Sequence, residues 1–130
     1  MTQQAIEVIL TRQLAAHLAM PTFLVGPDGR VLDFNQPAER VLGDRLEKAR
    51  TSSARELADL FEARDEAGEL VPAEKLPLVI ALEERHPAHA RLRVRGADQR
   101  ERELAVTAVP LVGQGSRFLG AVAFFWEVPQ

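Results

Sequence analysis

The spacing of apolar positions changes along the chain, and the first segment has the spacing of a helix. From Thr2 to Ala19 there is neither glycine nor proline, and apolar side chains recur every three or four residues. Pro21 ends the segment, because a proline disfavours helical geometry in the residue before it. The pattern predicts an N-terminal helix with one broad apolar face, formed by Ile6, Ile9, Leu10, Leu14 and Leu18.

This predicted helix is apolar on a second side as well. Val8, Ala15 and Ala19 lie opposite the broad face, and Gln13 and His17 fall in the middle of the broad face. We expect the small side to pack on the helix's own domain and the broad side to meet a second copy in a parallel homodimer. His17 then either titrates in that interface or bonds to a carbonyl as an ordinary half-buried histidine. The candidate dimer residues are Ile6, Ile9, Leu10, Gln13, Leu14 and His17.

Two short apolar runs follow, and a turn sequence joins them. The runs are Thr22–Val25 and Arg30–Phe34, and Pro27-Asp28-Gly29 between them is typical of a tight turn. The pair predicts a β-hairpin. Asn35 is a good N-cap, and Pro37 fits the first turn of a short helix.

The middle of the chain contains two further helix signals. Ser53 and Glu56 have the spacing of a capping box, which opens a helix burying Leu57, Leu60 and Phe61. Pro77 suits the first position of another helix that runs to about Arg85. Apolar residues surround this second helix almost completely, so we expect it to be packed on two sides.

The last third alternates with the period of a strand. Three such runs, His89–Arg95, Arg102–Leu111 and Arg117–Val128, are separated by glycine-containing turns and predict an antiparallel meander. The order of elements predicts an α+β domain with one five-stranded antiparallel sheet, helices packed on one face, and an N-terminal flanking helix. Such an architecture encloses a small space between sheet and helices.

Composition narrows the function classes. A chain of 130 residues with 46% hydrophobic content supports one domain. The net charge of -3, with scattered Lys and Arg, gives no basic surface for nucleic acid. The absence of cysteine excludes disulfides, thiolate metal sites and cysteine nucleophiles. No apolar run approaches about 20 residues, so we expect no membrane partner and a cytoplasmic location.

Four segments, in this order, resemble the PAS family: FLVGPDGRVLDFNQPAERVLG, LPLVIAL, LAVTAVPL and RFLGAVAFF. They are similar to the family's first hairpin with its terminal asparagine, its long packed helix and its last two strands. The resemblance covers Pro21 to Val128. It implies a non-catalytic sensory or dimerisation module of a bacterial-type signal-transduction protein, such as a two-component histidine kinase or another regulator. The implied organisation is a dimerisation helix over residues 1–20, a PAS sensor domain over 21–130, and a downstream effector domain.

The chain departs from the family pattern at two points. Gly26 stands where an acidic residue often precedes the first turn. The family's Asp-x-Thr signal at the end of the last strand is missing, and the chain has Phe124-Phe125-Trp126-Glu127-Val128-Pro129 instead. The second departure concerns the segment through which the family usually couples to an effector.

Apolar residues expected to point inward define a candidate ligand pocket. Its nearest polar candidates are Asn35, Thr107 and Arg91. Such a lining favours a small apolar ligand. An ordinary close-packed core explains the same residues, and the module would then be a ligand-free dimerisation scaffold. The apolar candidates are Val25, Leu32, Phe34, Phe61, Val79, Ile80, Leu92, Leu104, Val106, Val122 and Phe124.

The sequence supports a bound cofactor or a catalytic role less well than it supports an apolar pocket or a scaffold. Flavin photochemistry that needs a cysteine is excluded, while a flavin held for redox sensing stays an alternative. His86 and His89 are candidate haem ligands or surface histidines, and as a zinc pair they lack a third ligand. No nucleophile–base spacing is present, so we predict no catalytic residue, no metal and no bound cofactor. A small cavity enzyme that transfers protons is the remaining alternative.

Overall fold

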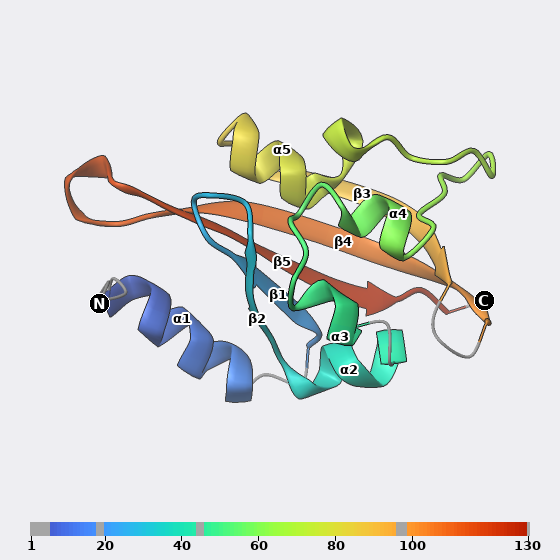
Figure 1. Ribbon diagram of the computed structural model, residues 1–130, viewed down its shortest axis with the longest axis horizontal. Coiled ribbons are helices and arrows are strands. Elements are labelled where there is room, and N and C mark those ends of the chain that lie inside the picture. Colours follow the sequence, from blue (N-terminus) through green and yellow to red (C-terminus); the bar gives the residue numbers. More distant parts are fainter. Residues whose placement is uncertain (1–5, 18–19, 44–45, 96–98, 130) are drawn as a thin grey trace.

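One five-stranded antiparallel sheet forms the centre of the molecule (Figure 1). The computed structural model describes residues 6–17, 20–43, 46–95 and 99–129. The strand order is β2-β1-β5-β4-β3, so the first hairpin pairs with the last strand of the chain. This arrangement confirms the predicted α+β class and the five-stranded antiparallel sheet. The strands are β1 Thr22–Val25, β2 Val31–Phe34, β3 Ala88–Arg95, β4 Glu101–Val112 and β5 Phe118–Glu127.

Helices lie on both faces of the sheet. Figure 1 shows α5 and α4 on one side and α1 on the other. The short α2 and α3 lie on the side of α4 and α5, where their buried residues join the same core. The helices are α1 Ile6–His17, α2 Gln36–Leu42, α3 Leu46–Ala49, α4 Leu57–Leu60 and α5 Pro77–Glu83, with 3₁₀ turns η2 Ala73–Lys75 and η3 Gln114–Ser116.

The local helix signals found in the sequence are present in the structure. Ser53 N donates to Glu56 Oε1 at 3.0 Å and Glu56 N donates to Ser53 Oγ at 3.4 Å, which are the two reciprocal bonds of a capping box. Pro77 occupies the first position of α5. That helix ends at Glu83, before the expected Arg85, because Arg85 itself adopts a positive φ of 60°.

The two faces of the sheet have separate apolar cores. The main core fills the space between the sheet and α2–α5. A smaller cluster on the opposite face joins Val8 of α1 to Leu24 of β1 and to Leu119 and Val122 of β5. The N-terminal helix therefore packs on its own domain through its small side, as its two-sided pattern predicted.

Gly120 allows β1 and β5 to approach closely where the first hairpin begins to turn. Its φ is 128°, a conformation that residues with a side chain rarely adopt. A Cβ atom built there would collide with the carbonyl oxygen of Val25. The pairing of β4 with β5 shifts register at Leu111 and Val112, next to the pairing of Leu111 with Gly120. A glycine is thus required at this join of three strands.

Gly120→Ala should destabilise the fold strongly. The backbone conformation alone costs roughly 1–3 kcal/mol for a residue with a side chain, and the collision with Val25 adds to it. We expect a loss of at least about 2 kcal/mol in the free energy of unfolding, measured by urea denaturation. Gly115→Ala is the matched control: Gly115 also has a positive φ, of 67°, but open space surrounds it. The control should lose about 1 kcal/mol, and equal losses for both variants would show that the close approach is unimportant.

Candidate functional site

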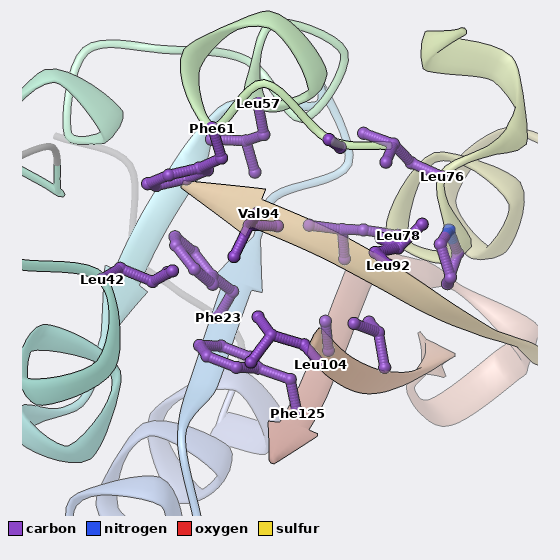
Figure 2. A pocket seen from close by; sticks show the side chains of 14 residues that line it. Phe23, Leu42, Leu57, Phe61, Leu76, Leu78, Leu92, Val94, Leu104 and Phe125 are labelled. Carbon is purple, nitrogen blue, oxygen red and sulfur yellow. The ribbon is translucent and has the colours of Figure 1, made fainter. Parts of the chain in front are cut away.

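An apolar cavity of about 80 Å³ lies between the sheet and the helical side of the domain (Figure 2). Strand residues form one part of its wall: Phe23, Leu92, Val94, Leu104, Val106, Ala123 and Phe125. The helical side contributes Leu42, Leu57, Phe61, Ala63, Leu76, Pro77 and Leu78. Every one of these side chains is apolar, so the cavity offers neither a charge nor a side-chain hydrogen bond.

Aromatic rings form one end of the cavity. The ring centroid of Phe23 is 6.4 Å from that of Phe61, in an edge-on arrangement, and 5.9 Å from that of Phe125. Phe34, which does not line the cavity, packs behind Phe23 at 5.8 Å. Such tilted and edge-on contacts are the favoured geometries for aromatic pairs. Figure 2 shows the leucines Leu76, Leu78 and Leu92 at the other end.

An ion pair joins the two helical parts of the wall at the surface. Arg55, just before α4, donates from Nη1 to both carboxylate oxygens of Glu83 at 2.8 Å. Its Nη2 lies 3.7 Å from Oε2 of Glu74 in η2. The hydrogen bond and charge of Glu83 raise the pKa of Arg55. All three side chains are exposed, so the pair orients α4 relative to α5 and contributes little to stability.

The structure brings part of the predicted pocket together. Phe61, Leu92, Leu104 and Val106 line the cavity as predicted. The buried Val25, Phe34 and Val79 belong to the main core and lie outside the cavity wall, and the half-buried Ile80 is likewise not part of the wall.

Three of the predicted pocket positions are wrong. Val122 and Phe124 face α1 on the opposite side of the sheet. Side chains alternate along a strand, and on β5 the inward positions are Ala123 and Phe125. Leu32 is 37% exposed on the edge strand β2.

Several cavity residues were missed, although some had a signal in the sequence. Val94 is two residues beyond Leu92, so the same alternation that selected Leu92 also selects Val94. Phe23 is two residues before Val25 on β1, so the alternation that selected Val25 as inward also selects Phe23. Ala63 and Ala123 had no signal, because a small apolar side chain is equally common in a filled core.

The three polar candidates do not face the cavity. Thr107 and Arg91 lie on the other face of the sheet: Thr107 Oγ1 is 2.7 Å from Nδ1 of the exposed His89, and Arg91 Nη1 is 4.0 Å from Glu103. Asn35 is buried, and its side chain is occupied by the fold. Its Oδ1 accepts from the backbone N–H groups of Thr22 at 3.0 Å and Ala38 at 3.2 Å. Its Nδ2 donates to the carbonyl oxygen of Met20 at 2.8 Å.

Asn35 therefore caps α2 and ties it to the start of β1. Asn35→Ala removes the cap, worth about 0.5–2 kcal/mol, and leaves buried backbone groups without partners at about 1–3 kcal/mol. We expect a total loss of about 2–4 kcal/mol in thermal or urea unfolding. Asn35→Asp keeps the acceptor but not the donor to Met20, so it should lose less. A stable alanine variant would contradict this structural role.

Neither candidate haem ligand reaches the cavity. His86 is exposed after α5, where Nδ1 is 3.0 Å from the carbonyl oxygen of Pro87 and Nε2 is 3.6 Å from Glu84. The bond to Pro87 and the charge of Glu84 raise the pKa of His86, which favours the protonated ring over a neutral metal ligand. His89 is exposed on the opposite face of the sheet.

Haem and flavin do not fit this cavity. Its wall has no axial ligand for iron and no polar group for a flavin ring. Its volume of about 80 Å³ is also well below the roughly 300–1,000 Å³ of ordinary cofactor and ligand pockets. Among the residues described, no group of three or more His, Asp and Glu could hold a metal ion. The cavity wall also offers no acid or base for proton transfer.

The outward side of α1 is the second candidate site. Ile6 is 67% exposed and Leu10 56%, and Ile9 and Gln13 are exposed beside them. The side chains of Leu14 and His17, and residue Leu18, lie outside the described part of the chain. The exposed apolar residues form the unpartnered side that the dimer prediction requires, and the dimer itself stays a prediction.

Comparison with known proteins identifies a family and several similar folds. The model of the PAS fold family matches residues 10–128. The structure is similar to the PAS domain of BvgS from Bordetella pertussis, with 16% identity, a TM-score of 0.68, and coverage of 97% of this chain and 89% of that chain.

Two further solved structures resemble it. A PAS domain from a two-component sensor histidine kinase has 13% identity and a TM-score of 0.56, covering 95% of this chain and 97% of that one. The Rhodobacter sphaeroides LOV protein has 14% identity and a TM-score of 0.70, covering 98% and 70%. At these identities the likeness shows the fold alone. No curated protein sequence matches the chain significantly. Within the described residues, no helix has the length and apolar character needed to span a membrane.

Proposed function

Because this chain belongs to the PAS family, we propose that it is a non-catalytic sensory module of a signal-transduction protein, in which the cavity binds a small apolar ligand and α1 forms a homodimer. The main observation behind the proposal is the wholly apolar cavity between the sheet and α4–α5. A pocket of this kind binds without chemistry, because it contains no acid, base or nucleophile.

The two faces of β5 provide the coupling between ligand and dimer. Ala123 and Phe125 contact the cavity. Val122 and Phe124, which alternate with them along the strand, point to the other face and pack in the cluster with Val8 of α1. A ligand that fills the cavity would contact the inward side chains of the strand on which α1 packs, and would stabilise one position of that strand. The signal would thereby reach the dimer helix and an effector, which we expect to be a histidine kinase or another regulator in the cytoplasm.

A ligand-free scaffold is the second candidate function. The small volume of the cavity favours it, because the main core is already close-packed around the remaining space. Dimerisation through α1 would then be the whole contribution of the module.

Native mass spectrometry of the protein purified from cells separates these functions. If the domain is a sensor, the native spectrum should show an added ligand mass that is lost on denaturation. If it is a scaffold, the spectrum should show the mass of the polypeptide alone. The same preparation should be colourless, because the cavity does not fit haem or flavin. A Soret or flavin absorption band would overturn the apolar-ligand proposal.

Charge placed on the outward side of α1 should break the homodimer. Ile6→Glu combined with Leu10→Glu puts two carboxylates where the apolar contact would form, and light scattering should then give the monomer mass. Leu70→Glu is the matched control, since Leu70 is 63% exposed but lies in the loop between α4 and η2. The control should remain dimeric. If the α1 variant also remains dimeric, the interface lies elsewhere and this role of the helix is wrong.

A further inference from the structure

We infer that the cavity ligand is a neutral molecule without polar groups and no larger than a single benzene ring. This inference rests on the proposed function and names the ligand class that the site accepts. It follows from three properties of the cavity: its volume, the absence of polar partners, and the rigidity of its walls.

Volume sets the upper size limit. A dry apolar cavity of about 150 Å³ holds benzene or xenon. The cavity here, at about 80 Å³, is roughly half that size. It therefore accepts xenon or a molecule of a few heavy atoms, and benzene only with some expansion of the walls.

The absence of polar partners excludes charged and strongly polar ligands. A carboxylate, phosphate or ammonium group moved into an apolar cavity loses its hydration and gains no partner. The buried Asn35 is used by the backbone, and Ser52 Oγ donates to the carbonyl oxygen of Lys48 at 2.7 Å. In the described part of the chain, no buried side-chain nitrogen or oxygen lacks a hydrogen-bond partner. No buried side-chain nitrogen or oxygen among the described residues is therefore left over for a ligand.

Two alanines control the free space, and the backbone holds both in place. Ala123 pairs with Phe23 of β1 on one side and Ala108 of β4 on the other. Ala63 N donates to the carbonyl oxygen of Ala58 at 3.0 Å, and the carbonyl oxygen of Ala63 accepts from Val71 N at 2.9 Å. Retreat of either wall beyond a small expansion would break these bonds, so a ligand larger than benzene cannot be accommodated cheaply. Aromatic rings at one end of the cavity (Figure 2) add a polarisable contact for such a guest.

Xenon is the probe for this inference. In ¹²⁹Xe NMR of the purified full chain, we expect a saturable change in chemical shift. Ala63→Val and Ala123→Val each add methyl groups to the cavity and should weaken xenon binding at least tenfold. Ala105→Val is the matched control: Ala105 is also buried in the sheet, but it is not part of the cavity wall. The control should bind xenon like the parent chain.

Protein stability and two further probes complete the test. Thermal unfolding checks that each valine variant is folded, and a variant that fills empty space should melt no lower than the Ala105 control. Benzoate, which adds a carboxylate to the ring, should not bind. Saturable binding of benzoate, or co-purification of a larger or polar molecule in the cavity, would overturn the ligand class and leave the sensor function standing. If no probe binds and no molecule co-purifies, both the ligand class and the sensor function are wrong.

Discussion

Burial of both faces of β5 organises this domain. The strand pairs with β4 along most of its length, and its middle part, Ala121–Phe124, also pairs with β1, so this part lies inside the sheet with neighbours on both sides. Its side chains alternate between the main core and the cluster under α1. The position of β5 thereby sets the distance between the cavity and the helix that we assign to the dimer. Gly120 at its start lets β1 approach closely enough for this arrangement.

The cavity persists because its surroundings cannot collapse into it. Empty space in a core costs about 24 cal/mol per Å³, so 80 Å³ corresponds to roughly 2 kcal/mol of lost stability. Small side chains at Ala63 and Ala123 leave the space, while the packed rings around Phe23 and the paired strands hold the walls apart. An apolar guest would recover part of that energy, which gives a ligand a means to shift the conformation of the domain.

Much of the fold could be predicted because its signals are local. The turn at Pro27-Asp28-Gly29, the cap at Asn35 and the capping box at Ser53 act within four residues of chain, so neighbouring residues suffice to identify them. Alternation along β3 likewise identified Leu92 as inward, since the outward positions there are basic. The two-sided pattern of α1 indicated that Val8 packs on the sheet while Ile6 and Leu10 face outward.

The candidate site was less predictable, because it arises where distant segments meet. An almost uninterrupted apolar run gives no outward marker on β5, so the choice between Val122 and Ala123 required the pairing with β1 and the packing of α1. Asn35 is a capping residue in the sequence, but its bond to Met20 depends on how α2 meets β1. The sequence could establish which segments are apolar and how each begins and ends. The cavity's size and wall came from three-dimensional packing, because a void is defined by side chains far apart in the chain.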